Sequence, residues 1–347
     1  MTAQFRLSGT AIPADARHML EEIADHFAEH ASVTRVGETV HLENEIGAAD
    51  ISIAGGTLAI ELASNSEDEL AMIRTVLAEH LFYFAGEEKF ELTWSEKPKP
   101  TLPANMRMAT VTGARTITPH MRRVTFSCPN VQDFEQGGLH VRLLLPQNGG
   151  APVWPVVGDD GRIRWPDEKI TAVRIYTIRG VDAERGEIDI DFVLHEGETM
   201  PGATFGATAA AGDLIGIMGP GGGWMPDAAD LILAGDETAL PAMLRIAEAA
   251  PAGTRVRFFG EVDSAEEEQP IASAAEVEVA WLHRSGAAAG TTGGLERLIR
   301  SLAPQWAAPV FIWVGCEKSE AAAIRDYLKD EQQYDRQCMR VGNYWEK

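Results

Sequence analysis

The residues best suited to binding a ligand lie in one strand-like segment, Arg174-Ile175-Tyr176-Thr177-Ile178-Arg179. Alternation along a strand is expected to bring its Arg, Tyr and Arg side chains to one face. An aromatic ring between two guanidinium groups can pack against a flavin ring and hold its phosphates through charge-assisted hydrogen bonds. Taken alone, the pattern is more often an exposed strand whose arginines form salt bridges. Neighbouring motifs are therefore needed to distinguish a flavin-binding strand from an ordinary exposed one.

Three further segments carry groups that suit a phosphate-containing ligand. The apolar run Asp191–His195 ends in a histidine, which by itself favours a structural role. The small-residue turn Pro201–Ala207 opens a short helix and offers free backbone N–H groups to a pyrophosphate. The segment Ala234–Met243 has a strand end, a glycine turn and a helix start, as in dinucleotide sites. This segment lacks a G-x-G-x-x-G pattern. Without other evidence, an ordinary strand-to-helix turn capped by Asp236 or Thr238 is a better interpretation than a dinucleotide site.

A chain of 347 residues must position these segments with two or three domains. Residues 1–97 are expected to form a small α+β module, with helical faces in Ala14–His30 and Ser66–Phe84 and a hairpin turn at Ala54–Thr57. The charged, proline-rich connector Lys97–Pro103 marks its boundary.

The rest of the chain changes pattern twice. Residues 104–222 contain short strand-like runs separated by Gly, Pro and Asp turns, which favours an antiparallel β-barrel. Residues 223–347 alternate apolar strand-like runs with helical stretches, which is typical of a parallel sheet covered by helices. The expected fold is therefore multidomain, with α+β, barrel and α/β parts.

Charge and cysteine content restrict the partners. The net charge of −22 argues against nucleic acid and anionic membranes. Residues 98–180 nevertheless hold 11 basic and 6 acidic side chains between two acidic stretches, which fits either chance or an anionic ligand. The three widely spaced cysteines cannot form a disulfide framework or a four-cysteine metal site. Without a membrane-spanning run or signal core, a cytoplasmic location is expected.

The motifs, taken in chain order, resemble the siderophore-interacting proteins, which are flavin-dependent ferric-siderophore reductases of the ferredoxin reductase superfamily. The resemblance covers about residues 105–347 and is carried by Arg174–Arg179, Asp191–His195, Gly212-Asp213, Gly219-Pro220, Ala234–Pro241, Trp281–Arg284, Trp313–Glu317 and Tyr344-Trp345. Residues 1–95 resemble a small module of unknown function fused to such reductases, through His26-Phe27, His80-Leu81, Phe84 and Trp94.

The resemblance implies an FAD-binding barrel followed by a domain that binds NADH or NADPH. The cofactor contacts it implies are Arg174, Tyr176, Thr177, Arg179, Asp191, Val193, His195, Ala203, Thr204, Asp236, Thr238 and Ala239. The last three would lie where NAD(P)H enters. This chain departs from the family pattern at Phe205, at Gly315-Cys316-Glu317 and at Asn343, and these departures affect the nicotinamide contacts more than the flavin contacts.

The implied activity is NAD(P)H-dependent reduction of a ferric siderophore, with release of Fe(II) in the cytoplasm for iron assimilation. Flavin chemistry needs neither a metal ligand nor an acid–base catalytic residue from the protein. Arg142, in a strand where the family often has lysine, is the first choice for an anionic ferric chelate, followed by Arg107 and Arg284. Two alternatives stay open: a flavin or quinone reductase of the same fold, and a siderophore-binding protein without turnover. A monomer is expected.

Overall fold

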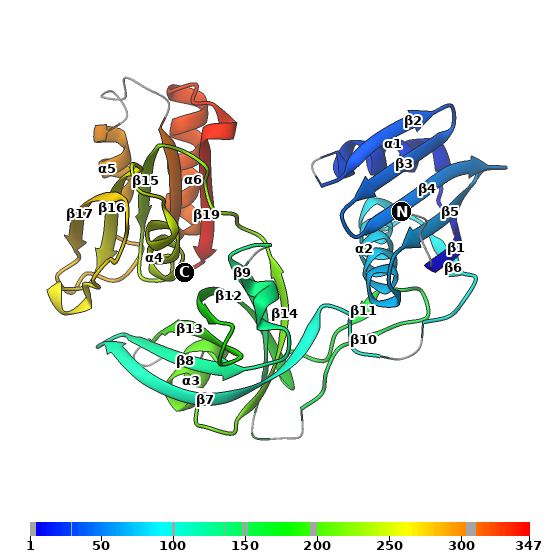
Figure 1. Cartoon of the computed structure of the whole chain (residues 1–347). Helices are drawn as coiled ribbons and strands as arrows, with labels where there is room; N and C mark the ends of the chain where they lie inside the picture. The colour runs from blue at the N-terminus through cyan, green and yellow to red at the C-terminus, as the bar shows by residue number, and fades with distance from the viewer. Residues whose placement is uncertain are drawn as a thin grey trace. The chain divides into compact units, whose positions relative to one another are not determined.

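The computed structural model describes residues 5–28, 30–98, 101–135, 137–147, 149, 152–194, 200–302 and 310–347 (Figure 1). The chain forms two compact units, Met1–Met106 with Asn148–Thr171, and Arg107–Gln147 with Ala172–Lys347. Within the described residues, no helix is long and apolar enough to cross a membrane.

The first unit is an antiparallel sheet of six strands, in the order β2-β3-β4-β5-β1-β6, that packs against two helices. Its elements are β1 (Phe5–Ile12), α1 (Ala16–Phe27), β2 (Ser32–Val36), β3 (Thr39–Asn44), β4 (Gly47–Ala54), β5 (Thr57–Ser64), α2 (Glu67–Ala85) and β6 (Glu91–Trp94). The helices lie in the two segments where the sequence predicts them, and the side chains of Asp15 and Ser66 cap them by accepting hydrogen bonds from first-turn N–H groups.

A hairpin from later in the chain completes this unit. Strands β10 (Val156–Val157) and β11 (Ile163–Arg164) pair in a segment that was expected to belong to the barrel. The indole nitrogen of Trp94 donates to the carbonyl of Asp160 at 2.9 Å, and the guanidinium of Arg162 lies 3.5 Å from the ring centre of Phe82. Residues 152–171 therefore pack with the N-terminal sheet, while the exact limits of the three expected domains stay a prediction.

The second unit begins with a closed six-stranded barrel in the order β12-β13-β8-β7-β14-β9. Its elements are β7 (Met106–Thr118), β8 (Met121–Ser127), η1 (Val131–Phe134), β9 (His140–Pro146), β12 (Thr171–Asp182), β13 (Glu187–Val193), α3 (Pro201–Thr208) and β14 (Leu214–Gly221). Alternate side chains fill the interior, where Phe126, Phe134 and Phe192 are fully buried. The expected antiparallel barrel is confirmed.

A parallel sheet in the order β17-β16-β15-β18-β19 completes the second unit (Figure 1). Its elements are β15 (Asp230–Gly235), α4 (Leu240–Ala249), β16 (Arg255–Val262), η2 (Ala265–Glu267), β17 (Glu276–His283), α5 (Gly294–Leu302), β18 (Phe311–Glu317), α6 (Lys318–Asp326), η4 (Tyr327–Glu331), η5 (Arg336–Cys338) and β19 (Met339–Trp345). Counted along the chain, this is the order 3-2-1-4-5. The chain therefore reverses direction across the sheet between β15 and β18, where open α/β sheets bind ligands.

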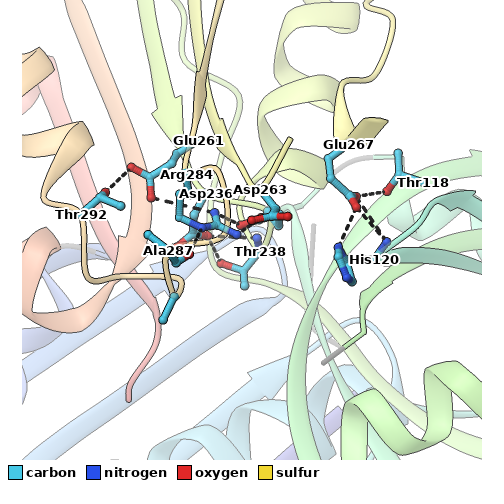
Figure 2. A network of polar contacts seen from close by, with 12 residues as sticks. Thr118, His120, Asp236, Thr238, Glu261, Asp263, Glu267, Arg284, Ala287 and Thr292 are labelled. Atoms are coloured by element: carbon cyan, nitrogen blue, oxygen red, sulfur yellow. Dashed lines mark hydrogen bonds and ion pairs between the residues drawn. The ribbon is translucent and has the colours of Figure 1, made fainter. Parts of the chain in front are cut away.

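Barrel and parallel sheet are joined by side chains from α4 and η2. Arg245 donates to the carbonyls of Ile178 (2.9 Å) and Phe134 (2.7 Å). Glu267 accepts from the hydroxyl of Thr118 at 2.5 Å and from the ring nitrogen Nδ1 of His120 at 2.7 Å (Figure 2). These bonds fix the carboxyl end of the sheet beside the barrel.

Candidate functional site

A cavity of about 460 Å³ lies between the barrel and the reversal point of the parallel sheet. This volume falls in the usual range for small-molecule sites, roughly 300–1,000 Å³. The barrel contributes His140, Arg174, Ile175, Tyr176, Thr177, Asp191, Val193, Met200, Gly202 and Ala203. The sheet contributes Thr238, Pro241, Trp313, Val314, Arg340, Gly342, Asn343, Tyr344 and Trp345.

Strand β12 supplies the aromatic and basic groups of the barrel wall. Arg174, Tyr176 and Thr177 all line the cavity, as the sequence suggested. The ring of Tyr176 packs 4.4 Å from that of Phe192, and burial raises the pKa of its hydroxyl, so it stays protonated at neutral pH. This wall can hold a planar aromatic ligand beside a positive charge.

The start of helix α3 faces the same cavity. Pro201 occupies the first turn, and the N-cap residue Met200 makes no side-chain capping bond. Gly202 lets the helix approach β12 closely, because a Cβ there would lie 2.0 Å from the hydroxyl oxygen of Tyr176. The N–H groups at this helix start, which Met200 does not cap, share a cavity with Arg174 and are a donor set that suits a phosphate.

The other residues predicted around this turn do not all line the cavity. Ala203 lines the cavity, whereas Thr204 is exposed on α3 and does not. Asp191 is buried and receives two hydrogen bonds from Arg123, at 2.6 and 2.8 Å, so it orients the β8 and β13 wall. His195 lies outside the described residues.

Arg179 does not share the face of Arg174 and Tyr176, and the expectation that it would is wrong. It stands three positions beyond Tyr176, and an odd spacing in a strand reverses the direction of the side chain. Its guanidinium donates to both oxygens of Glu248 on α4, at 2.8 and 2.6 Å, and it is absent from the cavity lining. Arg179 thereby joins the barrel to the sheet.

The strand β19 closes the sheet side of the cavity with two aromatic residues. Nδ1 of His140 donates to the carbonyl of Gly222 at 3.2 Å, which leaves Nε2 to accept from the Tyr344 hydroxyl at 2.9 Å. Burial lowers the pKa of His140 and raises that of Tyr344, so both are neutral at pH 7. Trp345 donates its indole N–H to Asp236 at 2.7 Å.

Asp236 connects this closure to the turn after β15. Its carboxylate also accepts from the backbone N–H of Thr238 at 3.0 Å and from the Thr238 hydroxyl at 2.5 Å. Burial raises its pKa to about 6, against the effect of these donors. Thr238 lines the cavity, whereas Ala239 is fully buried beneath it against Gly235 and Gly315.

The three arginines proposed to meet a substrate have different surroundings. Arg142 is exposed on β9 and, among the described residues, forms no ion pair. Arg107 pairs with Asp133, donates to the carbonyl of Gly219 at 2.7 Å and is largely buried. Arg284 is held by Glu237 in a buried ion pair, with hydrogen bonds of 2.8 and 2.5 Å. Arg107 and Arg284 therefore already have partners.

The sequence reasoning missed Arg340 and His140 as cavity residues. Arg340 on β19 lines the cavity and stacks its guanidinium 4.2 Å from the exposed ring of Trp224. Its only signal was its place in the last strand, next to the motif Tyr344-Trp345. Within the described part of the chain, His, Cys, Asp and Glu side chains form no group of three that could hold a metal.

Three family models match separate parts of the chain. Residues 110–224 match the siderophore-interacting FAD-binding domain, residues 228–347 the siderophore-interacting protein domain, and residues 10–95 an uncharacterized domain conserved in bacteria. The chain is 30% identical over 239 residues to the ferric vibriobactin reductase ViuB of Vibrio cholerae, covering 67% of this chain and 86% of that protein.

Two solved structures resemble the chain in both sequence and fold. A siderophore utilization protein from T. fusca is 36% identical, with a TM-score of 0.62 over 73% of this chain and 95% of that one. The siderophore-interacting protein SipS from Aeromonas hydrophila is 28% identical, with a TM-score of 0.57 over 70% of this chain and 92% of that one.

Proposed function

Because the chain belongs to the siderophore-interacting protein family, we propose that it is an FAD-containing reductase that transfers electrons from NAD(P)H to ferric siderophores. The overall reaction oxidises one nicotinamide donor, reduces two Fe(III) chelates to Fe(II) and releases one proton. NAD(P)H is a reductant of the cytoplasm, so we place the release of Fe(II) there.

The observation that carries the proposal is the joint lining of one cavity by Arg174 and Tyr176 of the barrel and Thr238 of the sheet domain. The barrel wall and the start of α3 suit FAD, since they combine an aromatic ring, a guanidinium and the N–H groups of a helix start. When bound, FAD accepts two electrons as a hydride and passes them on singly.

The chain's own residues would bind and orient the reactants. Arg174 and the N–H groups of α3 would hold the cofactor phosphates, and Thr177 would contact the ring side. Tyr344, fixed by His140, would close the sheet side and exclude water. Arg340 on Trp224 offers a positive aromatic platform for an anionic chelate, with the exposed Arg142 as a second contact.

The test is the visible spectrum of the purified protein during a stepwise anaerobic titration. We expect a bound flavin spectrum that bleaches with NADH or NADPH and returns when a ferric siderophore is added, with Fe(II) trapped by a ferrous chelator. Return of the spectrum with a quinone but not with the ferric chelate would indicate a quinone reductase. A protein that binds a ferric siderophore but no flavin would contradict the proposal.

A further inference from the structure

The carboxyl ends of the parallel strands bring together mainly acidic side chains (Figure 2). The carboxylates at this edge are Asp236, Glu237, Glu261, Asp263, Glu317 and Glu320. A dinucleotide held by such a sheet lies across this edge, where only Asp263 of these carboxylates is partly exposed and the others are buried beneath it.

The basic residue that ends β17 is already neutralised. Arg284 forms two hydrogen bonds with Glu237, and one of its nitrogens lies 3.9 Å from an oxygen of Glu261. The side chains of these three residues are only 7%, 9% and 3% exposed. A phosphate that took Arg284 would leave two carboxylates buried without their cation, which is strongly unfavourable.

The other cations near this edge also have partners. Arg297 donates to the carbonyl of Thr292 at 2.6 Å. Lys318 pairs with Glu346 at 2.9 Å, and Lys347 lies 3.7 Å from Glu317 and donates to the carbonyl of Gly290. Carboxylates therefore match the charges of Lys318 and Lys347, whereas the exposed Arg297 bonds, within the described part of the chain, only a backbone carbonyl and keeps its charge.

The starts of α5 and α6 at this edge are occupied by the chain's own carboxylates, whereas the N-cap residue of α4, Ala239, makes no side-chain capping bond. Glu317 accepts from the first-turn N–H groups of Ser319 and Glu320 in α6, at 2.8 and 3.3 Å. Glu320 accepts from the N–H of Glu296 in the first turn of α5 at 3.0 Å. Helix starts normally favour anions, but at α5 and α6 protein carboxylates take that place.

Asp263 stands where a ribose would meet the sheet. It directly follows β16, the second strand of the β15-α4-β16 unit, and one of its oxygens accepts from the N–H of Gly286 at 3.1 Å. A carboxylate after the second strand of such a unit accepts a hydrogen bond from the ribose 2′-hydroxyl of NAD, whereas a free arginine nearby accommodates a 2′-phosphate.

We propose that the electron donor of this protein is NADH rather than NADPH, with Asp263 and the Glu237–Arg284 pair as the residues that determine this specificity. The inference rests on the proposed function and narrows it. Asp263 accepts from the ribose hydroxyl of NADH, and the acidic edge repels a dianionic 2′-phosphate, so attraction and repulsion act in the same direction.

Binding of the oxidised nucleotides tests this without turnover. Calorimetric titration of the FAD-loaded protein should give a dissociation constant for NAD⁺ at least about tenfold lower than for NADP⁺. Asp263→Asn keeps an oxygen for the Gly286 N–H but removes the charge, so it should reduce that ratio severalfold. Glu278→Gln, an exposed position on β17 with the same change in charge, should leave the ratio unchanged.

Equal or tighter binding of NADP⁺ by the wild-type protein overturns the proposal, as does an unchanged ratio in Asp263→Asn. Glu237→Gln leaves Arg284 with the 3.9 Å contact to Glu261 as its remaining ion pair and should tighten NADP⁺ selectively. If that variant does not fold, the wild-type affinities for AMP and 2′-AMP give the same comparison.

Failure of the proposed function and failure of the NADH inference give different experimental results. Protein reduced with dithionite that reduces a ferric chelate, while neither nucleotide binds, would retain the ferric reductase and overturn the NADH inference. Preferential binding and oxidation of NADH without electron transfer to any ferric chelate would retain the NADH inference and overturn the ferric reductase.

Discussion

The indole nitrogen of Trp345 lies 2.7 Å from a carboxylate oxygen of Asp236, although 109 residues separate them in the chain. This bond attaches the last strand of the protein to the turn after the first strand of the parallel sheet. Because Trp345 and Thr238, the second partner of Asp236, both line the cavity, the buried carboxylate organises one whole side of the site.

Asp236 should make the protein less stable as the pH rises. Burial raises its pKa from 3.8 to about 6 in the folded state, so the favourable contribution is complete below 3.8 and is lost as pH passes 6. Asp236→Asn removes the titrating carboxyl group. Between pH 4 and 7 the free energy of unfolding of the wild type should therefore fall, relative to that of the variant, by on the order of 3 kcal/mol. Urea unfolding at several pH values measures this difference.

The exposed Asp227, in the loop before β15, provides the control. Asp227→Asn should show the same pH dependence of unfolding free energy as the wild type. An equal response in both variants would mean that the buried environment of Asp236 does not control the effect.

Arg174→Ala should weaken FAD binding. The change removes a charge-assisted contact worth roughly 1.5–3 kcal/mol, so the dissociation constant should rise about tenfold or more. Flavin fluorescence during titration of the apoprotein gives the constant. Arg115→Ala removes an exposed arginine from the same barrel, outside the cavity, and should bind FAD normally. Wild-type affinity in Arg174→Ala would exclude Arg174 from the cofactor site.

Gly161→Ala should destabilise the first unit more than Gly56→Ala. Both glycines have a left-handed backbone, with φ of +91° and +87°. A Cβ at Gly161 would lie 2.9 Å from the indole nitrogen of Trp94, whereas Gly56 has open space. Both variants carry the conformational cost of about 1–2 kcal/mol, and Gly161→Ala also disrupts the packing of the hairpin. Thermal unfolding of the two full-length variants compares them, and equal melting temperatures would contradict close packing.

Arg142→Glu should impair capture of an anionic ferric chelate. The chain carries a net charge of −22, so a local positive group matters for encounter. The apparent KM for the chelate should rise while the flavin spectrum and its reduction by the nicotinamide donor remain unchanged. Added salt should reduce the difference, since the screening length is about 8 Å at 0.15 M, and a neutral acceptor should show little effect. An unchanged KM at low salt would assign Arg142 to the surface only.

Local patterns in the sequence predicted many of the regular elements, although not the strands β1, β2, β10 and β11. The helices expected in Ala14–His30 and Ser66–Phe84 and the hairpin turn expected at Ala54–Thr57 all occur. These features depend on interactions between residues a few positions apart, and the spacing of apolar side chains records them directly. The division into barrel and parallel sheet followed from the same periodicities.

Only the tertiary structure shows which side chains the arginines pair with. The sequence marked Arg107, Arg179 and Arg284 as ligand contacts, yet each finds a carboxylate far along the chain, such as Glu237 for Arg284, 47 positions away. It gave no sign that residues 152–171 would pack on the N-terminal sheet or that Arg340 would line the cavity. An arginine looks the same in sequence whether its charge is neutralised or available, because that depends on which distant strands close beside it and exclude water.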